Sequence, residues 1–288
     1  MRKKCTAVII LISIILCLCS CSGSKSTSYF SIQFIDVGQG DSALVECDGH
    51  RMLIDGGDTT AGNKVYSILE DKQVRRLDIL AISHLHKDHI GGLPDALKNI
   101  TKINLTISNS ADDNKEAFIK LDSALNQVGS SIKVPPIGKK YSLGSASVEV
   151  VDTAANEDND SLVLLITYGD TRFLFTGDIG ENAQRRIVSK YENESNKPFK
   201  IDLIKMPHHG SKVTIRFIDV LMPDYAVISA SSSNLYRHPY TETLDMLDQA
   251  EVKLYRTDQS GDITVKSDGK RLSFTTENSY RVAGIWKW

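Results

Sequence analysis

The segment Ser83-His84-Leu85-His86-Lys87-Asp88-His89 carries the strongest information in this 288-residue chain. It follows the apolar run Leu77–Ser83 and holds three of the seven histidines. Imidazole and carboxylate groups are common ligands of zinc and related divalent ions. A single ion seldom needs four such groups so close together, so the spacing predicts two adjacent ions. We expect His84 and His86 on one ion, and Asp88 and His89 on the other.

Two further segments place similar side chains directly after apolar strands. Asp178 follows the predicted strand Arg172–Thr176 through one glycine, where a carboxylate can lie between two cations. His208 and His209 follow the predicted strand Ile201–Met206 in the same way. Loops at strand ends can aim side chains at a common point above a sheet. Adjacent histidines on a loop point in different directions, so we assign His209 to a metal and His208 to substrate contact or proton transfer.

His238 and the glycine-containing turn Asp36–Ser42 are weaker candidates. His238 lies in a polar loop before a proline, and we assign it a role beside the substrate, with a surface turn as the alternative. The turn Asp36–Ser42 lacks the Gly-Lys-Ser/Thr ending of a nucleotide P-loop. Its carboxylates, and Asp55 after a neighbouring strand, are expected to support the metal loop. His50 lies in the tight-turn signature Asp48-Gly49-His50, and we expect no role for it in the site.

The order of predicted elements indicates an α/β fold. A β-rich first half is followed by strands that alternate with helices, which suits helices packed outside two face-to-face sheets. Roughly 260 residues follow the export segment, and residues 29–288 are expected to form one domain with its own core. The predicted strands are Tyr29–Asp36, Ala43–Cys47, Met52–Asp55, Leu77–Ser83, Val148–Asp152, Leu162–Tyr168, Arg172–Thr176, Ile201–Met206, Tyr225–Ser229, Val252–Arg256, Asp262–Lys266 and Leu272–Thr276. The predicted helices are Lys64–Gln73, one from Leu93, Asn114–Val128, Glu181–Tyr191, Ile215–Leu221 and Thr241–Gln249.

The first 28 residues predict export. Three basic residues precede the apolar run Ala7–Leu18, which is too short to span a bilayer and is typical of a signal peptide over residues 1–20. The run ends in Leu18-Cys19-Ser20-Cys21, which resembles a bacterial lipobox with Cys21 as the acylated residue. Residues 21–28 then form the lipidated cysteine and a polar tether. We expect a lipoprotein on the outer face of the cell membrane; secretion after ordinary cleavage, or a short membrane anchor, is the alternative.

Charge and cysteine content limit the remaining classes. Without Arg2, Lys3 and Lys4, 31 basic side chains remain against 36 acidic ones, a formal charge of −5. Such a body gives no support to strong non-specific binding of DNA, which needs basic surface to displace counterions. Beyond Cys21 the chain contains only Cys47, so no internal disulfide framework is possible. We expect Cys47 to be a small buried residue of a strand.

Six segments together resemble the metallo-β-lactamase superfamily, in particular the branch that includes the extracellular hydrolase domain of ComEC and pneumococcal phosphorylcholine esterase. They occur in the family's order. The resemblance implies an αββα sandwich with two divalent ions, commonly zinc and with manganese as an alternative, at one edge of the sheets. It also implies that Asp178 bridges the ions and that His209 is the later histidine ligand. The matching segments are Phe34–Ser42, Ser83–Gly92, Asn159–Val163, Thr176–Asp178, His208–Ser211 and Asn234–Pro239.

One departure from the wider superfamily concerns the first ion. The histidine usually found before the bridging aspartate is missing, and Asp158-Asn159-Asp160-Ser161 occupies that stretch. The first ion would then be held by His84, His86 and Asp178, with water or the Asp160 carboxylate completing its sphere. A solvated loop position is the alternative for Asp160.

Two divalent ions suit hydrolysis, and we expect a phosphodiesterase. Asp88, His208 and His238 are the expected catalytic residues, with one of the two histidines stabilising charge on the leaving oxygen. The expected substrate is DNA, RNA or a teichoic-acid-like envelope polymer, and no obligate protein partner is inferred. Two alternatives stay open. One is β-lactam hydrolysis on the same fold, and the other is a non-catalytic lipoprotein that binds nucleic acid or an envelope polymer.

Overall fold

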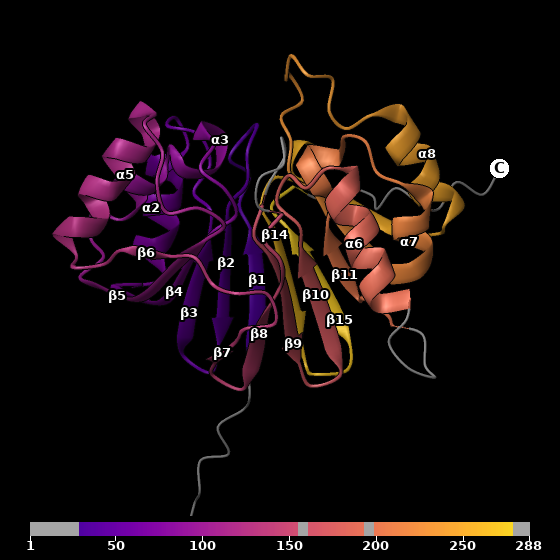
Figure 1. Cartoon of the computed structure of the whole chain (residues 1–288), viewed down its shortest axis with the longest axis horizontal. Helices are drawn as coiled ribbons and strands as arrows, with labels where there is room; N and C mark the ends of the chain where they lie inside the picture. The colour runs from indigo at the N-terminus through magenta and orange to yellow at the C-terminus, as the bar shows by residue number, and fades with distance from the viewer. Residues whose placement is uncertain (1–28, 155–160, 193–198, 279–288) are drawn as a thin grey trace, which may run out of the picture.

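Two β-sheets packed face to face form the centre of the molecule, and helices cover their outer faces (Figure 1). The computed structural model describes residues 29–154, 161–192 and 199–278. The expected signal peptide, the lipidated Cys21 and its tether lie outside the described residues, so they stay predictions. Within the described ranges, no helix has the length and apolar character needed to cross a membrane.

The first sheet contains eight strands and joins the two ends of the described chain. β1 pairs with β2 on one side and with β14 on the other, antiparallel in both cases. Apolar residues of α2 and α5 share a buried cluster with Leu44, Leu53 and Leu80 of this sheet. In sheet order the strands are β15 (Leu272–Thr276), β14 (Ile263–Ser267), β1 (Phe30–Phe34), β2 (Ala43–Cys47), β3 (His50–Ile54), β4 (Arg76–Ile82), β5 (Lys102–Ser108) and β6 (Ile132–Lys133); the helices are α2 (Gly62–Asp71), α3 (Lys87–Ile90), α4 (Leu93–Ala96) and α5 (Glu116–Gln127).

The second sheet contains seven strands from the later part of the chain. Its outer face is covered by α6 and α7, whose apolar residues pack with Leu174, Ile204 and Ala226 of the sheet. In sheet order the strands are β13 (Lys253–Arg256), β12 (Tyr225–Ile228), β11 (Leu203–Lys205), β10 (Thr171–Phe175), β9 (Val163–Tyr168), β8 (Ala146–Asp152) and β7 (Lys140–Leu143); the helices are α6 (Glu181–Glu192), α7 (Ile215–Leu221), α8 (Thr241–Gln249) and α9 (Thr257–Ser260), with the 3-10 turn η1 (Pro207–Gly210).

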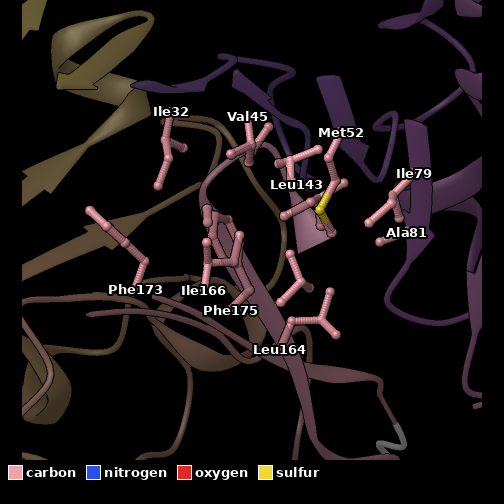
Figure 2. Packing of buried hydrophobic residues seen from close by; sticks show 14 of the residues in the cluster. Ile32, Val45, Met52, Ile79, Ala81, Leu143, Leu164, Ile166, Phe173 and Phe175 are labelled. Carbon is pink, nitrogen blue, oxygen red and sulfur yellow. The ribbon is translucent and has the colours of Figure 1, made fainter. Parts of the chain in front are cut away.

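The core between the sheets consists of the inward-facing residues of alternating strand positions. Ile32, Val45 and Met52 of the first sheet face Leu164 and Ile166 of the second across one buried cluster (Figure 2). At the far end of this layer Phe30 stacks on Tyr168 and on Phe173, with ring centroids 4.9 Å apart in both pairs. A shift of one residue in strand register would turn polar side chains into this layer, so the core fixes the pairing.

The observed α/β sandwich confirms the predicted fold class. The short strands β6 and β7 and the single-turn helices α3 and α9 are not among the predicted elements. β5 is not among the predicted strands, although its alternation of Ile103, Leu105 and Ile107 is the signal of a half-buried strand. The helix predicted from Leu93 is the single turn α4. Asn99, Ile100 and Thr101, which follow it, have low helix propensity and do not extend the turn.

The loops that carry the candidate residues leave their strands at one edge of the sandwich. β3 and β4 are parallel, and so are β10, β11 and β12, so the carboxyl ends of each group point the same way. α3 and the segment leading into α8 lie at this edge, at the top of Figure 1. Residues from both sheets therefore meet above the core.

The turn Asp48-Gly49 between β2 and β3 fastens this hairpin to the second sheet. Both residues have positive φ, 52° and 86°, as the predicted tight turn requires. The Asp48 carboxylate accepts hydrogen bonds from the backbone N–H groups of Tyr29 and Ser145, each at 3.0 Å. The Ser145 hydroxyl donates another, and these hydrogen bonds lower the pKa of Asp48 from 3.8 to about 2.

We predict that Asp48→Asn lowers the melting temperature by about 2–4 °C at pH 7. Because the pKa of Asp48 is lower in the folded state than its ordinary 3.8, its charge stabilises the fold above that value, and the effect is lost as pH falls towards about 2. The difference between wild type and variant should narrow at pH 3, as followed by circular dichroism. Asp170→Asn in the β9–β10 turn is the control. A pH-independent difference would contradict the argument.

Candidate metal centre

Asp178 lies at the middle of the candidate site. It follows β10 and is 4% exposed. Its Oδ2 atom lies 3.4 Å from Nε2 of His89, 3.7 Å from those of His84 and His209, and 3.8 Å from that of His208. Two of these histidines follow β4 of the first sheet and two follow β11 of the second. One carboxylate thus contacts loops from both halves of the sandwich.

Four of the predicted ligands converge closely. One ligand atom from each of Asp88, His89, Asp178 and His209 lies within 4.8 Å of all the others. The Asp88 Oδ2 atom is 3.3 Å from His209 Nε2 and 3.9 Å from His89 Nε2. This mixed set of imidazole and carboxylate donors is one that zinc and similar ions accept.

The hydrogen bonding of these side chains fits bound cations. His84 Nε2, His89 Nε2, His209 Nε2 and Asp178 Oδ1 are buried, and none has a hydrogen-bond partner in the described part of the chain. A buried polar atom without a hydrogen-bond partner lowers the stability of the fold. Here the three Nε2 atoms are grouped around the Asp178 carboxylate. Metal ions coordinated by these atoms would compensate that cost. The observed residues therefore form clusters able to hold metal ions.

Hydrogen bonds on the far side of each ring hold the histidines in place. His89 Nδ1 lies 2.9 Å from Asp55 Oδ2, and the other oxygen of Asp55 accepts the Ser83 backbone N–H at 2.7 Å. His209 Nδ1 lies 2.9 Å from the Ser229 carbonyl oxygen, which can only accept. The Nδ1–H of His209 therefore donates, and its Nε2 is left free to bind a metal. Asp55 was expected to support the metal loop, and it contacts that loop directly.

Ser161 and Gly177 position the central carboxylate. The Asp178 backbone N–H donates to Ser161 Oγ at 2.8 Å, and the same hydroxyl lies 3.4 Å from His84 Nδ1. Gly177 has φ +54°, and a Cβ there would lie 2.6 Å from Ser161 Oγ. Only glycine allows this turn and the close approach together.

A buried ion pair beneath the site was not anticipated from the sequence. Lys205 Nζ, 2% exposed on β11, lies 2.8 Å from Asp41 Oδ2 and donates to the Met206 carbonyl at 3.1 Å. Asp41 Oδ1 in turn lies 3.4 Å from His209 Nδ1, and the Asp41 N–H donates to the Asp88 carbonyl. The available signal was a lysine inside the otherwise apolar segment Leu203-Ile204-Lys205-Met206. A charge at such a position needs a partner.

The ionisation of the buried carboxylates favours positive charge at the centre of the site. Burial opposes ionisation of Asp178, but the neighbouring His89 and His209 hold its pKa well below its usual range. Burial also opposes protonation of His209, yet Asp178 and Asp41 raise its pKa to about 9. The pKa of His84 is lowered instead, by burial and by His89. The carboxylates thus favour cations at their centre, and metal binding would displace protons from the imidazoles.

His208 and His209 occupy different environments because the backbone turns sharply at both. Both have left-handed φ, 46° and 55°, and their rings are 69° apart in orientation. The His209 side chain is 1% exposed whereas that of His208 is 33% exposed. His238 joins them from the loop after β12, with its ring centroid 5.3 Å from that of His208. The structure thus brings His238 next to the half-buried His208, beside the buried ligands.

His86 and His50 lie outside the group of four converging ligands. His86 is exposed, and its ring lies edge-on to that of His84 with centroids 4.5 Å apart. Its role as a ligand stays a prediction. Asp160 lies outside the described residues. His50, for which no role in the site was expected, lies at the start of β3 and pairs with Asp78 of β4 at 3.1 Å.

Residues 35–232 match the family model described as the metallo-beta-lactamase superfamily. This range covers well over half of the chain and includes the ligand cluster above. The chain belongs to the metallo-β-lactamase superfamily. Together with the cluster of possible ligands, membership supports a hydrolase-type enzyme.

Among curated proteins, this metallo-β-lactamase-fold chain is similar to a ComE operon protein and a competence protein. It is 29% identical to ComE operon protein 3 of Bacillus subtilis, over 88% of this chain and 35% of that protein. It is 27% identical to competence protein ComA of Neisseria gonorrhoeae, over 78% and 30% of the two chains. These matches confirm the predicted ComEC-like branch. The chain spans only about a third of the length of these relatives.

Solved structures show the same fold at low sequence identity. The metallo-beta-lactamase fold protein YhfI of Bacillus subtilis matches with a TM-score of 0.55 and 11% identity, over 83% of this chain and 100% of that one. A mutant of the CmlA beta-hydroxylase matches with a TM-score of 0.54 and 14% identity, over 83% of this chain and 54% of that one. At these identities the likeness shows the fold alone.

We predict that Asp178→Ala and His89→Ala lose most of the bound metal, because each removes a buried donor from the cluster. Metal content of the purified protein, measured by inductively coupled plasma mass spectrometry, tests this. His50→Ala is the matched control, since it removes a histidine outside the cluster, and it should retain the wild-type content. Full metal content in Asp178→Ala would show that this carboxylate is not a ligand.

We predict that Lys205→Met lowers the free energy of unfolding by about 3–5 kcal/mol, because it leaves the buried Asp41 carboxylate without its cation. The double variant Lys205→Met/Asp41→Asn should recover part of that loss. Lys200→Met removes a lysine that pairs with Asp224 at the same 2.8 Å distance but on the surface. It should cost less than about 1 kcal/mol. Urea unfolding measures all three, and equal costs at Lys205 and Lys200 would contradict the buried pairing.

Proposed function

We propose that this protein is a metal-dependent phosphodiesterase that acts outside the cytoplasm. The observation that carries the proposal is the buried Asp178 carboxylate with four imidazole Nε2 atoms at 3.4–3.8 Å, open on the side of His208. The donor atoms suit two divalent ions, zinc first and manganese as the alternative. Asp88, Asp178, His89 and His209 would hold them together with His84, and His86 is the further expected ligand.

Two such ions, when bound, would supply an activated water and neutralise charge on a phosphoryl oxygen. The chain itself supplies neutral hydrogen-bond donors beside them. Burial lowers the pKa of His208, so its ring is neutral at pH 7. Burial and the adjacent His208 lower the pKa of His238 to about 4. Each neutral ring offers one N–H to a phosphoryl or leaving oxygen.

Gln39 sets which nitrogen of His238 carries the proton. Gln39 Oε1 accepts the Ser231 backbone N–H at 3.3 Å, so the amide nitrogen is the remaining donor. That nitrogen lies 3.5 Å from His238 Nδ1, which therefore accepts. The ring proton is left on Nε2, where it can be donated to a leaving oxygen. The turn Asp36–Ser42 thus contacts His238 through Gln39 and the metal loop through Asp41.

Nucleic acid is the proposed substrate, ahead of an envelope phosphodiester. The names of three relatives support this choice: ComE operon protein 3, competence protein ComA and recombination protein 2 of Haemophilus influenzae. The last is 25% identical over 84% of this chain and 29% of that protein. We also propose a lipoprotein location, on the support of the basic start, the apolar run and Cys21. Both are proposals for this chain.

The direct test is hydrolysis of bis(p-nitrophenyl) phosphate by the purified protein with zinc or manganese added. The expected result is activity that needs metal and disappears in Asp88→Ala/Asp178→Ala. Metal-loaded protein that leaves this ester and short oligonucleotides intact, while it hydrolyses a chromogenic cephalosporin or only binds polymer, would overturn the proposal.

We predict that His208→Ala and His238→Ala lower kcat about 100-fold while bound metal stays at the wild-type level. Each variant removes an N–H donor at the open side of the centre without removing a buried ligand. Steady-state kinetics and metal analysis on the same preparations separate the two effects. His50→Ala is again the control. Wild-type kcat in both variants would exclude these rings from the reaction.

A further inference from the structure

The loop between β12 and α8 exposes apolar side chains beside the metal centre. This segment rises above the body of the molecule before it enters α8 (Figure 1). Leu235 is 96% exposed and Tyr236 is 66% exposed. Arg237 follows them, also exposed and with a φ of 60°. An apolar residue, an aromatic ring and a cation thus stand next to each other at the open side of the site.

The base of this loop is well held, so its exposed tip is not a consequence of a loose backbone. The Asn234 side chain donates to the carbonyls of Ser231 and His238, each at 2.6 Å, and accepts the His238 N–H at 2.9 Å. The Oε1 atom of Gln39, which lies between β1 and β2 of the first sheet, accepts a hydrogen bond from the Ser231 N–H. Strained or exposed residues on a fixed loop are typical of ligand contacts.

A series of rings connects Tyr236 to the centre. The Tyr236 and His238 rings are stacked, with centroids 5.7 Å apart and planes 23° apart. The His238 ring lies 5.3 Å from that of His208, whose Nε2 is 3.8 Å from Asp178. One face of Tyr236 therefore packs on His238, and the ring lies only two rings away from Asp178. A flat group attached near a phosphate in the site would lie within reach of Tyr236.

We propose that Leu235 and Tyr236 form a subsite that stacks an unpaired nucleobase next to the scissile phosphodiester, with Arg237 beside a neighbouring phosphate. The proposal rests on the phosphodiesterase function proposed above and adds single-stranded nucleic acid as its substrate form. Aromatic side chains take bases of any sequence by stacking, but only bases that are not already stacked in a duplex. Polyol phosphate polymers of the envelope carry no flat ring for this subsite.

The test compares a short fluorescein-labelled oligo(dT) with an abasic strand of the same length and charge. The full chain in detergent is used, as wild type, Tyr236→Ala and Tyr236→Phe. Fluorescence anisotropy gives Kd and gel analysis gives cleavage rates. Tyr29→Ala is the matched control, because Tyr29 is 43% exposed at the start of β1, the end of that strand away from the metal loop.

We expect wild type to bind and cleave oligo(dT) about ten-fold better than the abasic strand, which corresponds to about 1.4 kcal/mol. Tyr236→Ala should lose this preference, and Tyr236→Phe and Tyr29→Ala should keep it. Equal affinity of wild type for both strands, or a preference that survives Tyr236→Ala, overturns the subsite.

The same measurements separate the two proposals. Protein that hydrolyses bis(p-nitrophenyl) phosphate and treats both strands alike is a phosphodiesterase without the subsite. Protein that prefers oligo(dT) through Tyr236 but cleaves no phosphodiester has the subsite without the proposed activity.

Discussion

The candidate site depends on one buried negative charge, the Asp178 carboxylate, which needs positive charge beside it. Asp178 is surrounded by imidazoles from loops of both sheets, and their charge holds its pKa well below its usual range despite burial. A buried carboxylate of this kind is stable only while positive charge lies beside it. Imidazolium protons or bound cations can meet that need. The position of Asp178 therefore requires positive charge at the centre of the site, from protonated histidines or from bound metal ions.

The rigid layers below explain why this position can be maintained. The core between the sheets fixes the strand register. The strands β10, β11 and β12 are parallel, so their carboxyl ends lie at one edge of the sandwich, where β4 also ends. Lys205 and Asp41 then join the two sheets by a buried ion pair directly beneath the ligands. Supporting contacts of this kind orient the ligands as well as stabilise the fold.

The open side of the centre differs in character from its buried side. There the chain presents neutral rings, His208 and His238, and then the exposed Tyr236 on a loop whose base is held by Asn234 and Gln39. The side chains thus change from buried ligands, through the half-buried His208 and the buried His238, to the exposed ring of Tyr236. Variation in this loop could change the substrate while leaving the metal centre intact.

The sequence by itself determined the family, the two-layer α/β architecture and the segments that carry the site. Those features are local, because ligand spacing in Ser83–His89, alternation within strands and tight-turn residues such as Asp48-Gly49 act between near neighbours in the chain. Only the tertiary structure decided that Asp178 contacts four histidines, that Lys205 pairs with Asp41, and that His86 is exposed beside His84. Lys205 and Asp41 are separated by more than half of the described chain, and no local pattern specifies which buried charge a lysine will meet. The pair forms only when the two sheets pack together, because packing excludes water from both charges and places them 2.8 Å apart.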